Sequence, residues 1–591
     1  MARIRFLLLP ALLIFLASCE KDPIEDKLKQ EIMIIEENPS TLGLRVSQIP
    51  GGRLMPIYPV DFDGTLKALK SESVPSKYEI YLRAEVDPPV HNGKTLQASH
   101  IKIVGNNAFV TYNTKGPEFL GGVDVFDVTD IENPVLIQGV IFPEKDISSI
   151  DIDPLGDGNN NFIYLTGAYN PDINELGLKS PAVVERFIAN KANQFRHLGE
   201  VRDHFDLESF AGNDVRHFKH DNERVFVTSG SGGGLSILGT GLTRHNYIPI
   251  PYARSIDTDG THLVVYSVEG NRLIVMNMEG DVQREIVTGG EHFDVDGKYL
   301  EAKSIVRLKE NLAFVAAGTG GMEVFNILTG EKVAFLERPQ VPQDAEFPLN
   351  YVTNGVSVNN DLVLVANGGS GVHIGEYDDT DVRSIGKFMF EYGSSANFIE
   401  ASDNKIFVAT GLGGLKILEI VKVETCTVSV KHPSTGSPAY FPEVYVTEAG
   451  VYNGTYRGWC AQSTVRIEEF TEYPAEIFSS LDNLTGKGVV EHPENLDKVN
   501  WILNQGFVGR ESDAGGKFTF GDVQYAIWDL ISFLPPLVSS PHVPDRVNEI
   551  FDLAEIHGPE FELQCGHVYA IIFVIEDKQN VIIEFPFPCD D

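Results

Sequence analysis

The residues of this chain best suited to chemistry are its cysteines, most of which gather near the C-terminus. Apart from Cys19, all of them lie in the last third of the sequence: Cys426, Cys460, Cys565 and Cys589. An even number of cysteines is what a disulfide framework requires in an exported domain, and four cysteines allow three pairings. Two disulfides are therefore one prediction for this segment.

Two short phrases in the same segment suggest another use for one cysteine. The first is Gly458-Trp459-Cys460-Ala461-Gln462, and the second joins Val499–Phe507 to Val523-Gln524-Tyr525-Ala526-Ile527-Trp528. Together they resemble the thioester domains of bacterial surface adhesins, and the resemblance spans residues 424–591. It implies a bond between Cys460 and Gln524, with Trp459 and Trp528 as the aromatic side chains that exclude water.

The chemistry that this resemblance implies is a single acyl transfer. The thiolate attacks the amide carbon of the glutamine side chain, ammonia leaves, and an acyl thioester remains until a partner's amine or hydroxyl takes the acyl group. A thioester at Cys460 leaves three other cysteines in the domain, whereas members of the family often lack these additional cysteines. Both roles therefore stay open, and in the structural alternative Gln524 braces a helix and Trp528 belongs to the core.

Metal binding is weakly indicated at one place. Asp151, Asp153 and Asp157 fall in a glycine-containing loop with the hard oxygen ligands that calcium prefers, but no bidentate glutamate follows them. A solvated turn is the alternative interpretation. The sequence has no nucleophile elbow, P-loop or dinucleotide fingerprint, so no other metal or soluble cofactor is predicted.

The elements that must position these residues are predicted to be almost all β-strands. Glycine is abundant, with 55 residues, and helical spacing is sustained only from about Leu496 onward. Between about residues 95 and 421 one phrase recurs: an apolar strand, a polar turn, a second apolar strand, glycines and a third strand. The units are centred at residues 109, 162, 226, 264, 314, 364 and 407.

This repeat is typical of a β-propeller, because a spacing of about fifty residues suits four-stranded blades. The predicted fold class is all-β: a seven-bladed β-propeller over residues 77–423, followed over 424–591 by a smaller, mostly-β domain with short helices. The strand Tyr78–Ala84 precedes the first unit and would complete the last blade. Helices are predicted at Leu496–Gln505 and Phe520–Phe533.

The first unit carries the most specific repeat pattern. Its residues 121–136 read Gly-Gly-Val-Asp-Val-Phe-Asp-Val-Thr-Asp-Ile-Glu-Asn-Pro-Val-Leu, which resembles the LVIVD repeat, a propeller repeat. The other units match only in part. The resemblance implies a β-propeller in a surface or extracellular setting, and it implies no settled activity.

Polar residues open the innermost strand of each unit, where side chains tend to face the central channel. Candidates for ligand binding or acid–base chemistry there are His100, Asp214, Arg254 and Lys303. Since a water-filled channel is also lined by polar residues, solvation of the channel is the alternative explanation. Nothing in their spacing shows that the four converge.

The N-terminus predicts export and attachment to a membrane. A basic start, an apolar run and small residues before Cys19 describe a signal peptide over residues 1–18. Leu16-Ala17-Ser18-Cys19 resembles a lipobox, which implies a diacylglyceryl lipid on Cys19. The acidic cluster that follows resembles the surface-export signal of Bacteroidetes lipoproteins, so the predicted location is the outer membrane, facing outward. Residues 19–76 are predicted to be a lipidated N-terminus and tether.

Charge narrows the class of partner. The formal net charge of −37 repels nucleic acid and anionic lipid headgroups, so nucleic acid is not a predicted partner. The predicted partners are the membrane, reached through the lipid, and a protein or glycan on a cell surface or envelope. The preferred function is a binding or adhesion module that is no turnover enzyme. The alternatives are a propeller lyase or hydrolase acting on extracellular polysaccharide or peptide, and a structural docking protein of the cell envelope.

Overall fold

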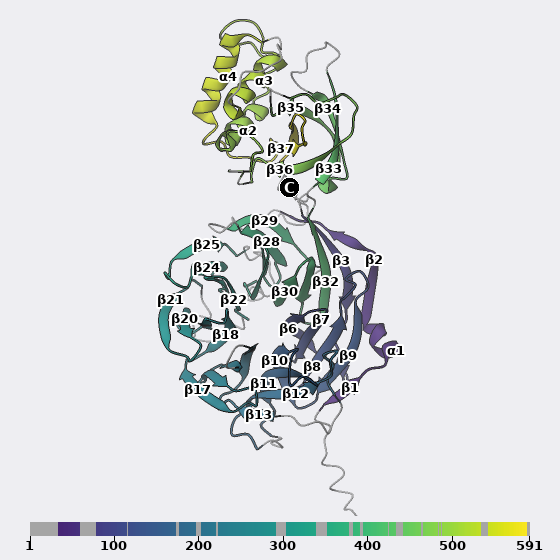
Figure 1. Ribbon diagram of the computed structural model, residues 1–591, viewed down its shortest axis with the longest axis vertical. Helices are drawn as coiled ribbons and strands as arrows, with labels where there is room; N and C mark the ends of the chain where they lie inside the picture. Colours follow the sequence, from purple (N-terminus) through teal and green to yellow (C-terminus); the bar gives the residue numbers. More distant parts are fainter. Residues whose placement is uncertain are drawn as a thin grey trace, which may run out of the picture.

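Seven antiparallel sheets stand around a common axis in the computed structural model of this chain (Figure 1). The first strand of each sheet contacts the first strand of the next in a closed circle. The seven-bladed propeller predicted from the repeats is therefore confirmed. The structure describes residues 33–58, 78–114, 116, 118–172, 177–196, 203–219, 223–290, 303–338, 351–377, 382–390, 394–422, 425–432, 441–462, 465–482, 484–485, 487–532 and 542–587.

Blades 1 to 6 each take four consecutive strands, from the channel outward. Blades 1 and 2 contain β6 (Gln97–Val104), β7 (Asn107–Asn113), β8 (Gly121–Asp127), β9 (Val135–Phe142), β10 (Lys145–Asp153), β11 (Asn161–Tyr169), β12 (Ala182–Ala189) and β13 (Asp203–Asp206). Blades 3 and 4 contain β14 (Gly212–Phe218), β15 (Arg224–Ser229), β16 (Gly234–Leu238), β17 (Arg244–Pro249), β18 (Ala253–Thr258), β19 (His262–Ser267), β20 (Arg272–Asn277) and β21 (Val282–Val287). Blades 5 and 6 contain β22 (Val306–Lys309), β23 (Leu312–Ala316), β24 (Met322–Asn326), β25 (Lys332–Leu336), β26 (Gly355–Asn359), β27 (Leu362–Ala366), β28 (Val372–Tyr377) and β29 (Val382–Phe388).

Blade 7 combines the two ends of the propeller segment. Its inner strands are β30 (Phe398–Ser402), β31 (Lys405–Ala409) and β32 (Leu415–Lys422), and β3 (Tyr78–Val86) pairs with β32 from Tyr78 opposite Lys422 to Val86 opposite Leu415. Ile80, Leu82 and Ala84 on β3 are fully buried. The strand that the sequence predicted as the closing element does close the ring.

Residues 33–55 form a segment that we call the closing strap. The sequence placed these residues in a tether, but they lie on the propeller, since β1 (Ile34–Glu36) pairs with β9 of blade 1 and β2 (Val46–Met55) with β3 of blade 7. Helix α1 (Pro39–Leu42) and a 3-10 turn (Gly43–Arg45) join them. The strap thus crosses the junction between the first and last blades on the outside of the ring.

Arg45 anchors the closing strap at this junction. Its guanidinium donates two hydrogen bonds to the carboxylate of Asp124 on β8, one of 2.9 Å, and a third of 3.0 Å from Nε to the backbone carbonyl of Asp87 after β3. The Asp124 side chain is 1% exposed. A carboxylate buried to this extent requires a charged partner, and the strap supplies it.

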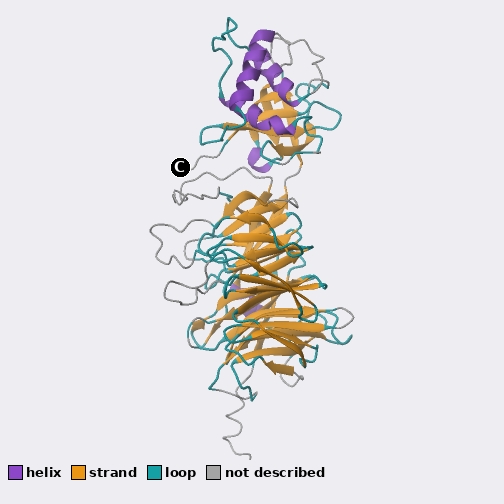
Figure 2. Ribbon diagram, turned by 90° about the vertical axis from the view of Figure 1, so that its left-hand side faces the viewer, coloured by secondary structure: helices purple, strands orange, loops and turns teal. Residues whose placement is uncertain are grey.

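The second domain is a closed six-stranded barrel with three helices on one side (Figures 1 and 2). The order around the barrel is β33 (Thr425–Lys431), β34 (Phe441–Thr447), β35 (Gly454–Cys460), β38 (Val581–Pro586), β37 (Val568–Val574) and β36 (Tyr473–Ser479). The helices are α2 (Leu496–Asn504), α3 (Phe520–Ile531) and α4 (Pro544–His557). The two predicted helices are present, each ending slightly earlier than expected, whereas α4, β34 and β36 were not predicted. Short elements complete the chain: β4 (Val90–His91), β5 (Lys94–Thr95) and 3-10 turns at Gly450–Tyr452 and Pro493–Asn495.

An ion pair joins the two domains. Arg383 on β29 lies 2.7 Å from the carboxylate of Glu376 in its own blade and 2.8 Å from that of Asp482, which follows β36 in the barrel domain. The barrel domain therefore contacts the propeller at blade 6, close to where the chain leaves blade 7.

We predict that Arg45→Ala lowers the free energy of unfolding of the propeller by about 3 kcal/mol, because the buried Asp124 carboxylate loses its partner. Urea unfolding followed by circular dichroism measures this loss. The control is Arg272→Ala, which breaks a half-exposed pair with Glu285 at 3.1 Å and should cost less than about 1 kcal/mol. Equal losses in the two variants would contradict the anchoring role of Arg45.

Candidate functional site

Cys460 and Gln524 come from two elements that meet where the barrel joins the helices. Cys460 is the last residue of β35, opposite Val581 on β38, and Gln524 lies in the first half of α3. Thr519 and Asp522 fix the start of α3 through a capping box, in which each side chain bonds the backbone of the other residue. The cap sets which residues of α3 turn toward the barrel.

The side-chain amide of Gln524 is held on the backbone of Cys460 by two hydrogen bonds. The backbone N–H of Cys460 donates to Oε1 of Gln524 at 2.8 Å, and Nε2 of Gln524 donates to the carbonyl of Cys460 at 2.9 Å. Both residues are 0% exposed. The structure therefore brings together the cysteine and the glutamine that the two sequence phrases singled out.

Aromatic side chains surround this pair on both sides. Trp528, one helical turn after Gln524, packs with Cys460 in the core inside the barrel. Trp459 packs in the other core, beneath the helices, and its indole N–H donates to Glu584 at 2.9 Å. Both tryptophans are 2% exposed. Burial raises the pKa of the Cys460 thiol well above its usual value, so the free thiol is protonated at neutral pH.

The cysteines do not form the two disulfides that the sequence allowed. Cys426 and Cys460 are both free and buried, and Cys565 is disulfide-bonded. Cys426 lies on β33 and Cys460 on β35, with β34 between them, and strands two apart are separated by about 9–10 Å, too far for a disulfide. Burial raises the pKa of Cys426 to about 12. Cys19 and Cys589 lie outside the described residues.

A pocket of about 600 Å³ opens immediately beside Cys460. Ala461 and Gln462, which follow the cysteine, line one side, and Ile531 and Ser532 at the end of α3 line another. The segment after β36 completes the wall with Thr485, Gly488, Val490, Glu491, Pro493 and Glu494. The pocket thus borders Ala461, the residue after Cys460, although both residues are buried.

The channel candidates of the propeller converge only in pairs. The Ser149 hydroxyl donates to Asp214 at 2.8 Å and lies 3.4 Å from Nε2 of His100, so the hydroxyl links the other two side chains. Arg254 donates from Nε to the backbone carbonyl of Lys303 at 3.0 Å. His100 is 3% exposed and Asp214 1%. Arg254 and Lys303 are half-buried, so the burial of His100 and Asp214 does not extend to all four candidates.

Below this network a ring of charges runs around the channel. One equivalent position on the inner strand of each blade, opposite the centre of the second strand, carries Lys102, Asp151, Arg216, Asp257, Arg307, Ser357 and Glu400 in blade order. The signs alternate except at the neutral Ser357. Neighbours pair at 2.9 Å (Lys102 to Asp151) and 3.6 Å (Arg216 to Asp257), and Arg307 reaches past Ser357 to Glu400 at 3.4 Å.

The ring also ties each even-numbered blade to the next through its backbone. Asp151 accepts a hydrogen bond from the backbone N–H of His217 at 2.8 Å, and Asp257 accepts one from Leu308 at 2.8 Å. In blade 6 the hydroxyl of Ser357 accepts the equivalent bond from Ala401 at 3.0 Å. Serine therefore keeps the hydrogen bond of the aspartates without their charge.

The predicted calcium loop does not bring its carboxylates together. Asp151 belongs to the charge ring, Asp153 accepts from the backbone of Leu155 at 3.0 Å, and Asp157 accepts from the backbone of Asn159 at 2.9 Å and Asn160 at 2.7 Å. Among the described residues, no three His, Cys, Asp or Glu side chains gather as metal ligands. Asp151 and Asp153 lie on the same face of β10, where Asp151 pairs with Lys102 and Asp153 lies 3.8 Å from Nε2 of His217, while Asp157 lies beyond the end of the strand.

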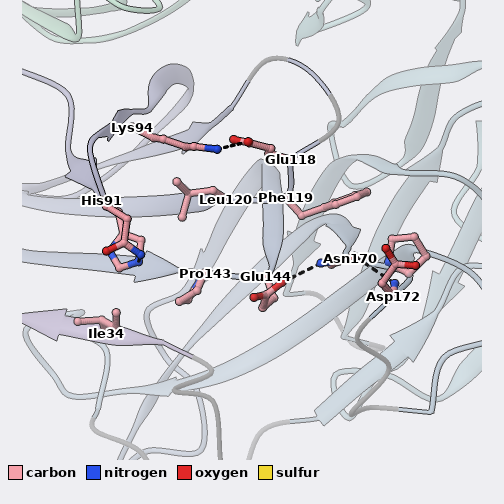
Figure 3. A pocket seen from close by; sticks show the side chains of 12 residues that line it. Ile34, His91, Lys94, Glu118, Phe119, Leu120, Pro143, Glu144, Asn170 and Asp172 are labelled. Carbon is pink, nitrogen blue, oxygen red and sulfur yellow. Dashed lines mark hydrogen bonds and ion pairs between the residues drawn. The ribbon is translucent and has the colours of Figure 1, made fainter. Parts of the chain in front are cut away.

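A second pocket, of about 840 Å³, lies on one face of blades 1 and 2 (Figure 3). None of its residues was a sequence candidate. Its polar groups pair with one another: Lys94 with Glu118, and Asn170 with Glu144 at 2.8 Å. Its lining comes from the segments around β1, β5, β8, β9 and β11. These segments are far apart in the sequence, so no local sequence pattern predicted the pocket.

In the part of the chain that the structure describes, no helix has the length and apolarity needed to cross a membrane.

No protein-family model and no curated protein sequence matches this chain. Among solved structures, it is similar to U3-55K (11% identity, TM-score 0.41, 56% of this chain and 98% of that one). It is also similar to the RRP9 WD40 repeats (11%, 0.41, 60% and 100%) and to the designed protein Ika8 (12%, 0.32, 56% and 98%).

We predict that removing the Gln524 amide destabilises the barrel domain. In a Cys460→Ala background, which keeps the amide intact, Gln524→Met should lower the free energy of unfolding by about 2–5 kcal/mol, because the buried N–H and C=O of residue 460 lose their partners. Urea unfolding measures the loss. The matched control is Gln505→Met, whose amide bonds Trp501 at 3.1 Å at the end of α2; a loss as large there would show that the effect is not specific to the pair.

A pH prediction follows from His100. Burial, and then the nearby Arg216 and Arg307, lower the pKa of His100 well below 6.5. Near pH 6.5 the histidine therefore takes up a proton in the unfolded chain but stays neutral in the folded chain. The free energy of unfolding then falls as the pH drops below 6.5, by up to about 1.4 kcal/mol per pH unit. We expect His100→Gln to remove the contribution of this one proton from the slope of unfolding free energy against pH. Urea unfolding between pH 7.5 and 4.5 checks it, and an unchanged slope would mean that His100 titrates normally.

Proposed function

We propose that this protein is a lipid-anchored surface protein whose barrel domain captures a partner covalently, through a thioester between Cys460 and Gln524. The observation that carries the proposal is the pair of hydrogen bonds that holds the Gln524 amide on Cys460 at a fully buried position. Thioester formation needs the thiol and the amide carbon in one place, and it needs water kept away afterwards. The resemblance of both sequence phrases to adhesin thioester domains supports the same chemistry.

The geometry also supplies a group for the charge that develops during the reaction. When sulfur attacks the amide carbon of Gln524, Oε1 becomes negatively charged, and the Cys460 N–H already donates to that atom at 2.8 Å. Backbone donors aimed at a developing oxyanion are a major source of catalysis in acyl transfer. The pocket beside Ala461 gives a partner's amine a route toward the acyl group.

The propeller fold fits a binding or docking module. In this proposal it is the rigid platform that recognises the partner or holds the barrel domain away from the membrane, with Cys19 as the lipidated residue. Of the acid–base candidates of the channel, His100 and Asp214 are buried and linked through Ser149, which does not favour an enzyme acting on polymers. The partner class that fits an acyl acceptor site is a surface protein with accessible lysine amines.

The test is the intact mass of the chain from Glu20 to Asp591 without reductant. We expect a mass about 17 units lower than that calculated from a Cys460→Ala variant corrected for the substitution, because ammonia has left. The deficit should disappear in Gln524→Ala and after treatment with methylamine. Cys426→Ala is the matched control, since Cys426 is also free and buried in the same barrel, and it should keep the deficit.

Alkylation gives an independent check on the same protein. After unfolding in guanidinium at pH 5, N-ethylmaleimide should label Cys426 but not Cys460, because only Cys460 is acylated. Peptide mass mapping reads both sites. Labelling of both cysteines, together with a mass without the deficit, would show that no thioester forms and would reduce the protein to a non-covalent binding module.

A further inference from the structure

The turn between β37 and β38 is hydrogen-bonded to the segment that follows Cys460. Within the turn, Asn580 accepts from the backbone of Ile575 at 3.2 Å and donates to the carbonyl of Val489 at 3.1 Å. Its backbone carbonyl accepts from the N–H of Ala461 at 2.9 Å. Three segments that are distant in the sequence are thus fixed against one another next to Cys460.

Gln579 is the residue of this turn that reaches the reacting atom. Gln579 is 5% exposed, and its side-chain amide donates to the carbonyl of Gln462. The same amide donates to the sulfur of Cys460, and this contact works against burial by lowering the pKa of the thiol. The sulfur therefore has Gln524 held on its own backbone and the amide of Gln579 against it.

We infer that Gln579 is a further catalytic residue of the Cys460 chemistry, acting as the hydrogen-bond donor that stabilises the thiolate. The inference rests on the proposed function. A charge on sulfur in a dry site is costly, and a donor from a neutral amide reduces that cost without adding a second buried charge.

The donor serves both halves of the reaction. In the first half the S–H bond gives up its proton, sulfur bonds to the amide carbon of Gln524, and the C–N bond breaks. The nitrogen leaves as ammonia and carries the proton that the sulfur lost. In the second half a partner's amine bonds to the carbon, the C–S bond breaks, and the thiolate takes the amine's surplus proton. Sulfur carries charge as nucleophile and then as leaving group, and Gln579 contacts it in both.

The experiment uses the chain from Glu20 to Asp591, refolded from urea, and follows by mass the appearance of the form that has lost ammonia. We expect Gln579→Met to slow this step roughly 10- to 100-fold, the effect of one hydrogen bond to a charged atom. Opening of the thioester by methylamine should slow similarly. Lys578→Met is the control, because Lys578 lies in the same turn but its side chain points to Tyr473 and Glu468; its rates should match the parent.

Gln579→Glu separates a catalytic from a packing role, because glutamate has the same shape. Its protonated form donates a hydrogen bond and its ionised form repels the thiolate. The ratio of its rate to the parent rate should therefore fall as the pH rises from 4.5 to 8, whereas a packing defect gives a constant ratio. A parent that forms no thioester would overturn both the proposed function and this inference. A parent that forms one, with Gln579→Met unaffected, would overturn this inference alone.

Discussion

The whole propeller depends on one antiparallel pairing, that of β3 with β32. This pairing joins residues more than three hundred positions apart, Tyr78 with Lys422 and Val86 with Leu415, so it links the two ends of the propeller segment. Without it blade 7 would present an open sheet edge and blade 1 an uncovered face. The closing strap adds a second layer of protection, because β1 and β2 cover the outer edges of blades 1 and 7 and Arg45 neutralises a carboxylate between them.

The barrel domain is built on a different constraint, the need to hold an amide and a thiol together away from water. A strand end supplies Cys460 and a capped helix supplies Gln524, so both backbones are rigid where the two residues meet. Trp528 closes the site from inside the barrel and Trp459 from the helical side. The turn carrying Gln579 and Asn580 completes the enclosure. The residues that enclose the Cys460–Gln524 pair therefore come from a strand, a helix and a turn held by side-chain hydrogen bonds.

Local patterns in the sequence were sufficient for the blades, because each repeat encodes strands and turns within about fifty residues. They failed where the pattern is interrupted. Pro442 and Glu443 break the alternation of β34, Pro474 in β36 lacks the backbone N–H that a strand normally supplies, and α4 buries only Val547, Ile550 and Ala554. The unit placed at residue 162 is centred instead at Tyr164, which faces Asp151.

Only the part of the candidate site that lies within short sequence phrases could be predicted. The phrases around Cys460 and Gln524 identified two residues that the fold brings into contact. Gln579 lies in no phrase, and its role depends on a turn that reaches across from the opposite end of the domain. The expectation of two disulfides counted cysteines, whereas pairing depends on the distance between strands. The charge ring could not be predicted from local patterns either, because its members are about fifty residues apart in the sequence and meet only in the folded propeller.

That ring has a consequence for how the propeller can evolve. Opposite signs can alternate without conflict around an even number of positions, but seven is odd, so somewhere two like charges must meet or one member must give up its charge. Ser357 is that member, and it sits between Arg307 and Glu400. The neutral side chain of Ser357 thus lets charges alternate around a ring with an odd number of positions. Duplicating or deleting a blade that carries a charge would bring two like charges together, directly or across Ser357, whereas blade 6 could be duplicated or lost without such a conflict.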